Sequence, residues 1–200
     1  MLLARIAPVD AIGDRDALIV VDPQNDFCPG GALAVPRGDA IFGNVNRLLP
    51  RFRHVLATQD WHPADHSSFA AQGGPWPPHC LQGSHGAEFH PALHPEWIQE
   101  VVRKGVDVAT DGYSGFAGTD LAERLHARGI ERVVVCGLAT DYCVRATVLE
   151  ALQHGFRAAV VTDAVAAVNI QPDDGTEALK EMHAAGATLV TTDALTPSPR

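Results

Sequence analysis

Short apolar runs alternate along the chain with segments in which apolar residues recur every three or four positions. Apolar runs of this length that are rich in β-branched residues are typical of buried strands, and the longer spacing is typical of helices packed by one face. Strands are predicted at residues 17–21, 54–58, 97–105, 131–137, 157–163 and 187–192. Helices are predicted at residues 38–50, 121–128, 141–154 and 174–185.

This order predicts an α/β fold of the doubly wound kind, with a mainly parallel sheet and helices on both faces. The strand runs are continuously apolar rather than alternating, as expected for strands covered on both sides. The sequence shows no internal repeat and no linker composition, so residues 1–200 are predicted to form a single domain. In such folds ligands bind beyond the carboxyl ends of the strands. The positions of interest are those after Val21, Thr58 and Val135 and those around Lys104.

Residues 60–96 break the alternation. They contain six prolines and no convincing periodicity, and loops longer than about 12–15 residues in compact domains are usually functional or disordered. Aromatic side chains bury large areas and argue against disorder. The aromatics concerned are Trp61, Phe69, Trp76, Phe89 and Trp97. We therefore expect an ordered loop that builds a site.

The same loop is rich in histidine, with six of the ten histidines of the chain between residues 62 and 94. Asp60, His62 and His79 are interpreted as ligands of one divalent metal ion. A carboxylate with two imidazoles suits such an ion and leaves positions open for water or substrate. Zinc is favoured, with iron and manganese as alternatives. His66 is a candidate fourth ligand, or a residue that supports one of the ligands.

The alternative for any single loop histidine is that its ring is simply solvated. This interpretation is preferred for His85, His90 and His94. Cys80 stands next to His79 and could compete as a thiolate ligand, but it is predicted to be a buried structural thiol.

Asp22, Lys104 and Cys143 each have an ordinary structural explanation. An Asp before Pro is usually a turn or cap residue, and a single lysine at a strand end is usually solvated.

Cys143 could be a buried hydrophobe, half of a disulfide, a metal ligand or a nucleophile. It is predicted to lie in the first turn of a helix capped by Thr140 or Asp141. A helix N-terminus and a nearby cation lower the pKa of a thiol, and a carboxylate can accept its proton. Convergence at one sheet edge would therefore make these three residues a nucleophile, a base and an electrostatic anchor.

The bulk composition narrows the class of protein. The net charge of -9 argues against a nucleic-acid or anionic-membrane surface, and no stretch approaches the ~20 apolar residues of a membrane helix. Four cysteines without a CxxC pair are too few for a disulfide scaffold, and Cys136, inside a strand, is interpreted as a core residue. Residues 1–16 lack the apolar core of a signal peptide. We expect a cytoplasmic protein with a small-molecule partner; a homo-oligomer is compatible with this composition.

Six motifs occurring in order resemble the nicotinamidase/pyrazinamidase branch of the isochorismatase-like cysteine hydrolases. They are VDPQNDFCPGGALAV (21–35), TQDWHPADHSSFA (58–70), WPPHC (76–80), RKG (103–105), YSGF (113–116) and GLATDYCVRAT (137–147). VNIQP (168–172) fits the same group. The resemblance extends from about residue 17 to residue 193.

The resemblance implies that Cys143 is the nucleophile, that Asp22 is the general base and acid, and that Lys104 holds both in register. It further implies an oxyanion hole made by the backbone N–H groups of Ala139 and Cys143. A cis peptide bond is expected between Leu138 and Ala139.

The resemblance also implies the metal ligands Asp60, His62 and His79, with His66 as a further ligand in some members. The implied substrate-binding residues are Phe27, Trp76, Tyr113 and Leu138, whereas Tyr142 is expected to matter less. The implied reaction is metal-dependent hydrolysis of nicotinamide, or of pyrazinamide-type analogues, to the acid and ammonia. It would run through a cysteine thioester and serve NAD salvage.

Two other functions are compatible with parts of this pattern. Sibling cysteine amidohydrolases that act on another small amide or carbamoyl compound share the Asp, Lys and Cys residues but not the metal ligands, and isochorismatases proper lack the cysteine as well. A non-catalytic binder on the same fold would be expected to lack at least one of Asp22, Lys104 and Cys143. The loop histidines therefore favour the nicotinamidase interpretation.

Overall fold

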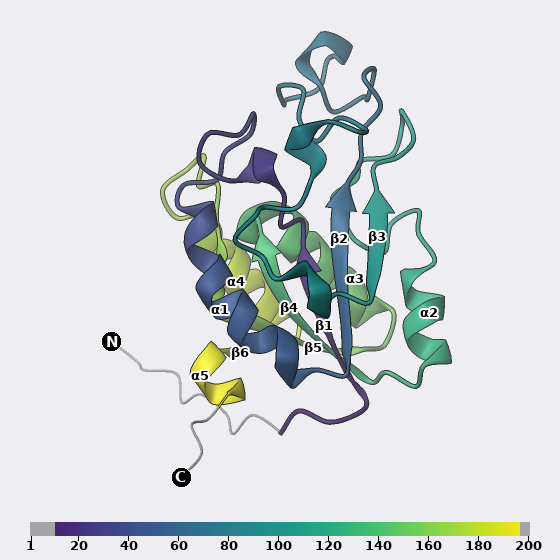
Figure 1. Ribbon diagram of the computed structural model, residues 1–200, viewed down its shortest axis with the longest axis vertical. Coiled ribbons are helices and arrows are strands. Elements are labelled where there is room, and N and C mark those ends of the chain that lie inside the picture. The colour runs from purple at the N-terminus through teal and green to yellow at the C-terminus, as the bar shows by residue number, and fades with distance from the viewer. Residues whose placement is uncertain (1–10, 197–200) are drawn as a thin grey trace.

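A computed structural model describes residues 11–196, which form a single six-stranded sheet (Figure 1). The order across the sheet is β3-β2-β1-β4-β5-β6, and every pair of neighbours is parallel. The predicted α/β fold is confirmed, and the described sheet is parallel throughout. The strands are β1 Asp16–Val21, β2 His54–Asp60, β3 Glu100–Lys104, β4 Arg132–Leu138, β5 Arg157–Ala166 and β6 Thr188–Val190.

Helices cover both faces of the sheet, as the continuous apolar strands predicted. Residues of α1 and α5 belong to the core on one face, and residues of α2, α3 and α4 belong to the core on the other. The helices are α1 Phe42–Leu48, α2 Leu121–Ala127, α3 Arg145–Gln153, α4 Asp174–Ala184 and α5 Thr192–Leu195. None of the helices within residues 11–196 has both the length and the apolar character needed to cross a bilayer.

Strand β1 shows why the sheet is buried from both sides. All six of its residues are buried. Leu18 and Val20 pack into the core on the α1 face, while Ala17, Ile19 and Val21 pack into the core on the α3 face. Successive side chains of a strand point to opposite faces, so residues 17–21 are apolar on both sides, and the one buried carboxylate of the strand, Asp16 at its start, is paired with Arg132.

Most predicted elements have slightly different boundaries in the structure, among them one helix and two strands. The helix expected at 38–50 is divided into a 3₁₀ turn (Gly38–Ile41), α1 and a second 3₁₀ turn (Leu49–Arg51). The α-helix ends before Pro50 because proline has no N–H group with which to continue it. The strand expected at 97–105 begins only at Glu100, after the 3₁₀ turn Pro95–Trp97. The last strand is shorter than the predicted 187–192, since Thr192 already begins α5.

The loop from residue 60 to about residue 96 extends past the carboxyl ends of β2 and β3, at the top of Figure 1. It contains only short 3₁₀ turns, yet Phe69 within it is completely buried. Isolated bridges fix it internally, between His62 and Leu81 and between Phe69 and Trp76. The expectation of an ordered loop is confirmed. The expectation about a signal peptide concerns mainly residues 1–10, which lie outside the described residues.

Candidate active site and metal centre

Four functional side chains come together at the carboxyl edge of the sheet. Asp22 directly follows β1, Asp60 and Lys104 end β2 and β3, and Cys143 lies in the turn after β4. Neighbouring strands β1 and β4 continue into helices on opposite faces, since α1 and α3 belong to different cores. Such a switch point leaves a crevice at the carboxyl end of a parallel sheet. The convergence inferred from strand ends is therefore present.

Lys104 lies at the centre of this group and is almost completely buried, which excludes the alternative of a solvated strand end. Its Nζ lies 2.8 Å from Asp22 Oδ2 and 2.5 Å from Asp60 Oδ1. It also donates to the carbonyl oxygen of Gly112 at 2.5 Å and to the sulfur of Cys143 at 3.4 Å. Burial opposes the charge, but the two carboxylates outweigh it and raise the pKa of the Lys104 ammonium well above its usual value. Lys104 is thus a permanent cation that binds the acid and the thiol together.

Asp22 is held in one orientation by its backbone and by Thr58. Its φ of 45° lies in the left-handed region, so the backbone no longer has the extended conformation of β1 at this residue. Oδ1 accepts a hydrogen bond from Thr58 Oγ1 at 2.6 Å, while Oδ2 faces the ion pair with Lys104. Burial raises the pKa of Asp22 to about 6, with Lys104 opposing and Asp60 reinforcing the rise. A carboxyl group with this pKa can both accept and release a proton near neutral pH.

Cys143 lies in a single π-helical turn, Thr140–Val144, that leads into α3. The prediction that Thr140 or Asp141 caps this helix is wrong. Ala139 occupies the cap position and no side chain caps it. The carboxylate of Asp141 instead accepts hydrogen bonds from the backbone N–H groups of the loop after β5, at residues 168 and 169.

The expectation of a lowered thiol pKa is also not met. Burial raises the pKa of Cys143 well above its usual value, and although Lys104 opposes this rise, Asp22 and Asp60 add to it. A thiol with a raised pKa would need a base before it could act as a nucleophile. The carboxylate of Asp22 lies within 4.8 Å of the Cys143 sulfur, and its pKa of about 6 suits a candidate base.

The backbone of β4 shapes the turn that carries the cysteine. The expected cis peptide bond between Leu138 and Ala139 is present. The carbonyl oxygen of Ala139 accepts hydrogen bonds from the N–H groups of Tyr142 and Val144, both at 3.1 Å. Just before it, Gly137 has a φ of 116°, and a Cβ there would lie 2.1 Å from the carbonyl oxygen of Val21. Only glycine allows β4 to approach β1 so closely at this point.

Asp60, His62 and His79 form a compact, buried set of three potential metal ligands. Their ligand atoms all lie within 4.8 Å of one another. Oδ2 of Asp60 is 3.4 Å from Nε2 of His62 and 4.0 Å from Nε2 of His79. A tetrahedral ion with ligands at about 2.1 Å places its ligand atoms roughly 3.4 Å apart, so the set has the right size for a divalent ion.

The ring orientations of the two histidines also suit a metal. Nδ1 of His62 lies 3.0 Å from the carbonyl oxygen of Gly105, and Nδ1 of His79 lies 2.8 Å from that of Pro77. A carbonyl can only accept, so each Nδ1 donates a hydrogen, which in a neutral ring places the lone pair that a metal needs on Nε2. Burial lowers the pKa of His79, which keeps this ring neutral.

His66 lies behind this set rather than in it. Its ring is 4.1 Å from that of His62. Both of its nitrogens have protein partners, since Nδ1 is 2.7 Å from Ser68 Oγ and Nε2 is 2.8 Å from the carbonyl oxygen of Thr110. The proposal that His66 binds the metal directly does not fit this arrangement, whereas support of His62 through ring contact does.

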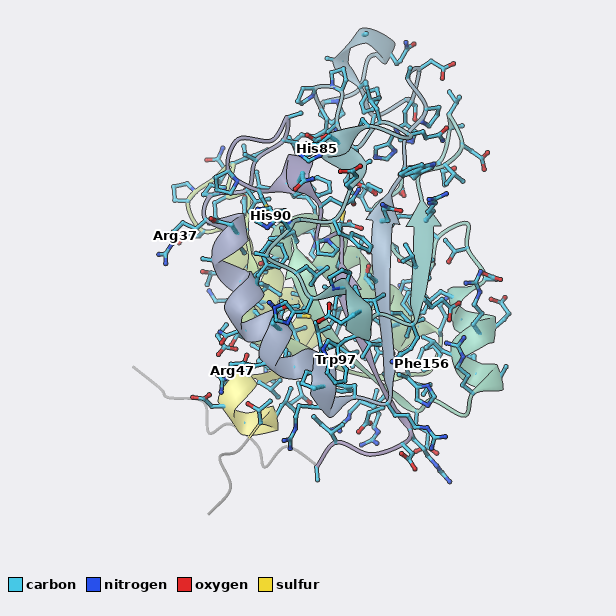
Figure 2. All side chains as sticks on the ribbon, in the orientation of Figure 1. Arg37, Arg47, His85, His90, Trp97 and Phe156 are labelled. Carbon is cyan, nitrogen blue, oxygen red and sulfur yellow. The ribbon has the colours of Figure 1, made fainter. Side chains whose placement is uncertain are left out.

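The remaining loop histidines lie apart from the site. The side chains of His85 and His94 are 83% and 58% exposed, in keeping with solvated rings. His90 is half-buried and lies beside α1 (Figure 2). Its ring stacks on that of Phe42 at the start of this helix, with ring centroids 4.8 Å apart. It differs in this respect from the prediction of a solvated ring.

A cavity opens above the cysteine and the metal set, and its walls are mainly apolar and aromatic. Phe27, Trp76 and Tyr113 line it as expected. Tyr142, which was expected to matter less, also lines the cavity and contacts the ring of Trp76 edge-on at 5.0 Å. Leu138, expected at the substrate, is instead completely buried in the core. It contributes to the site through its peptide bond with Ala139.

The other three cysteines have structural positions. Cys28, Cys80 and Cys136 are buried and, like Cys143, free of disulfides. Burial raises the pKa of the Cys28 thiol to about 12, and burial raises the pKa values of Cys80 and Cys136 as well. The interpretation of Cys136 as a core residue is confirmed.

Two buried polar residues that hold the site were missed in the sequence. Thr58 was placed in the strand expected at 54–58 without a role of its own, and Gln24 was given no role. The only signal was that each is polar within or beside an apolar run at a strand end. Such a residue is buried at a cost unless it has hydrogen-bond partners.

Comparison with known proteins gives a consistent result. Residues 16–194 match the Isochorismatase domain family. The nicotinamidase of Escherichia coli (strain K12) is 48% identical, covering 88% of this chain and 94% of that protein. The structure of PnC1 from L. infantum in complex with nicotinate has a TM-score of 0.88 and 41% identity, over 92% of this chain and 96% of that one. The structure of the pyrazinamidase of Pyrococcus horikoshii in complex with zinc has a TM-score of 0.83 and 48% identity, over 88% and 99%. The chain belongs to the isochorismatase domain family.

Proposed function

We propose that the protein is a metal-dependent amidohydrolase that converts nicotinamide, and pyrazinamide-type analogues, to the corresponding acid and ammonia. The observation that carries this proposal is the contact of Lys104 with Asp22, Asp60 and Cys143 directly beside the two histidines. This arrangement joins an acid–base pair for amide hydrolysis to a site for a metal. The names of the similar proteins, nicotinamidase and pyrazinamidase, point to the same substrate class.

Asp60, His62 and His79 would hold one divalent ion, for which we propose zinc, with iron and manganese as alternatives. The bound ion would supply an electron-pair acceptor for the ring nitrogen of the substrate. Phe27 and Trp76, on the cavity wall, would hold the flat ring of the substrate and exclude water from it.

The first half of the reaction uses Cys143 and Asp22. Asp22 accepts the thiol proton, and the sulfur attacks the carboxamide carbon to form a C–S bond. The backbone N–H groups of Ala139 and Cys143 are proposed to stabilise the resulting oxyanion. Asp22 then gives its proton to the amide nitrogen, the C–N bond breaks, and ammonia leaves a thioester on Cys143. Lys104 stays charged throughout and keeps the sulfur and the carboxylate in contact.

The second half repeats the proton transfer with water. Asp22 accepts a proton from a water molecule, whose oxygen attacks the thioester carbon. The C–S bond breaks, the proton returns to the sulfur, and nicotinate is released. The pKa of about 6 at Asp22 suits both directions of transfer.

The cellular setting follows from this reaction by inference. We propose that the protein acts in NAD salvage in the cytoplasm, with a small amide as its partner and neither nucleic acid nor membrane. We further propose that residues 1–200 act as one domain whose loop at about 60–96 carries the metal site.

The test is release of ammonia from nicotinamide before and after chelation. Cys143→Ala should lower turnover by about 10⁴-fold or more, because it removes the nucleophile, while Cys136→Ala should stay active. Chelation should lower activity, and added zinc should restore it. Near-normal turnover by the Cys143 variant would end the proposal. Full activity on a carbamoyl compound without metal would favour a sibling amidohydrolase.

A further inference from the structure

The side chain of Gln24 makes an unusual set of contacts with the metal-binding strand. Gln24 is completely buried just past the end of β1. Its Oε1 accepts a hydrogen bond from the backbone N–H of Asp60 at 2.8 Å. Its Nε2 donates to the backbone carbonyl oxygen of the same residue, also at 2.8 Å.

These two hydrogen bonds take the place of strand pairing that β1 no longer provides at Asp60. The pairing of β1 with β2 ends at Val20 and Ala57, whereas β2 continues to Asp60 along its other neighbour, β3. The N–H and C=O groups of Asp60 face the side that β1 has left, and they would be buried without partners, which is costly. The primary amide of Gln24 pairs with both groups, as a peptide unit of a neighbouring strand would.

The same amide connects this strand to the metal-site loop. Nε2 of Gln24 also donates to the carbonyl oxygen of Ala87 at 3.0 Å. The backbone of Asp60 is therefore fixed from the side opposite β3. Its carboxylate can then lie between Lys104, at Oδ1, and the imidazole of His62, at Oδ2.

We infer that Gln24 is a positioning residue for the metal site, acting through the backbone of Asp60 without contacting the ion. This inference rests on the proposed metal site. Groups that orient metal ligands commonly change metal affinity by about 10–100-fold when they are removed. Loss of the Gln24 amide should therefore weaken metal binding by a comparable factor.

Gln59 offers a matched control in the same place. It is also buried, and its Nε2 donates to the same carbonyl oxygen of Ala87, at 2.8 Å. Its Oε1 accepts from Arg103, and its side chain makes no hydrogen bond to the Asp60 backbone among those observed in the described residues. A Gln59→Met variant loses a comparable buried hydrogen bond but keeps the clamp on Asp60, that is, the two hydrogen bonds between the Gln24 amide and the Asp60 backbone.

The experiment measures transfer of zinc from the zinc-loaded full-length protein to a chromophoric chelator. Gln24→Met should bind zinc about 10–100-fold more weakly than wild type. Gln59→Met should keep the zinc affinity of the wild type, even if its thermal stability falls as much as that of Gln24→Met. Gln24→Glu keeps an acceptor for the N–H of Asp60 and, when protonated, one donor, so its affinity should be intermediate.

Each other outcome overturns the inference. Wild-type affinity in Gln24→Met, or in Gln24→Glu if the methionine variant does not fold, would show that the clamp is only structural. An equal loss in Gln59→Met would show a general packing effect. Failure of the wild type to bind zinc would remove the proposed metal site itself and is a separate, recognisable result.

Discussion

The hydroxyl of Thr58 makes two hydrogen bonds with Asp22, as donor in one and as acceptor in the other. It donates to Oδ1 at 2.6 Å and accepts from the backbone N–H of the same residue at 3.1 Å. The hydroxyl therefore orients the carboxylate and favours its charged form. Both effects matter if Asp22 is to accept a proton from a buried thiol.

Thr58→Val should move the acid limb of the pH profile of kcat/KM to higher pH. Burial raises the pKa of Asp22 to about 6, and the hydrogen bond from Thr58 is one of the contributions that lower it. Removing the hydroxyl raises this pKa further, so the carboxylate form appears only at a higher pH. The check is a pH profile for nicotinamide hydrolysis, in which Thr58→Ser should resemble wild type. An unchanged acid limb in the valine variant would contradict this role.

The convergence of Asp22, Lys104 and Cys143 could be predicted from the sequence because it depends on topology alone. The carboxyl ends of parallel strands meet at one edge, so residues at these ends are neighbours whatever their distance along the chain. The proposed metal ligands could be predicted partly from topology and partly from resemblance. Asp60 and His62 leave one strand end together, and the motif around His79 resembles a known family.

The supporting residues could not be predicted because their partners depend on exact geometry. Asp141 is of a residue type that commonly caps helices and stands where a cap is expected. Its carboxylate instead accepts hydrogen bonds from a loop more than twenty residues away in the chain. The resemblance implies that Tyr142 matters less than the other aromatics, but it lies in the π-helical turn and lines the cavity. The thiol pKa of Cys143 depends on the balance between burial and three nearby charges, which no sequence spacing reveals.

Gly105→Ala should weaken metal binding. Gly105 has a φ of 60°, and a Cβ there would lie 2.4 Å from Cε1 of His62. The ring would have to move away from the set that it shares with Asp60 and His79. The backbone conformation itself costs about 1–2 kcal/mol for a non-glycine residue.

Gly129→Ala separates these two effects. Gly129 has a φ of 70°, but no atom lies within 4 Å of the position that a Cβ would occupy there. Gly129→Ala should lose only the stability that its positive φ costs, and Gly105→Ala should lose at least as much in thermal unfolding because the His62 ring must also move. Only Gly105→Ala should release zinc more readily to a chelator. Equal zinc affinity in the two variants would show that His62 can move without affecting the site.

Lys104→Met should destabilise the protein by about 3–5 kcal/mol, because it leaves two buried carboxylates without their cation. Lys104 lowers the pKa of Asp22, so in the variant this pKa lies above 6. A buried acid with a raised pKa loses stability as pH rises through that pKa. The stability difference from wild type should therefore grow between pH 6 and pH 8.

Denaturant unfolding of the metal-free proteins at several pH values measures this difference. Lys180→Met is a suitable control, since Lys180 is exposed and its ion pair with Glu177 lies at the surface. It should leave stability unchanged at every pH. A deficit in Lys104→Met that is constant from pH 5.5 to pH 8 would show that Asp22 is not the group responsible.

Asp141→Ala should raise KM for nicotinamide and reduce stability. The buried carboxylate accepts hydrogen bonds from the N–H groups of Val168 at 3.0 Å and Asn169 at 2.8 Å, and Val168 lines the cavity. Its loss leaves two donors unpaired, at a cost of about 1–3 kcal/mol, and frees one wall of the substrate cavity. Asp141→Asn keeps one acceptor, so its thermal stability and its KM should lie between those of wild type and those of Asp141→Ala. Because Cys143 is only two positions away, the ratio of effects is decisive: a fall in kcat with KM unchanged would mean that Asp141 fixes the turn carrying the nucleophile rather than the cavity wall.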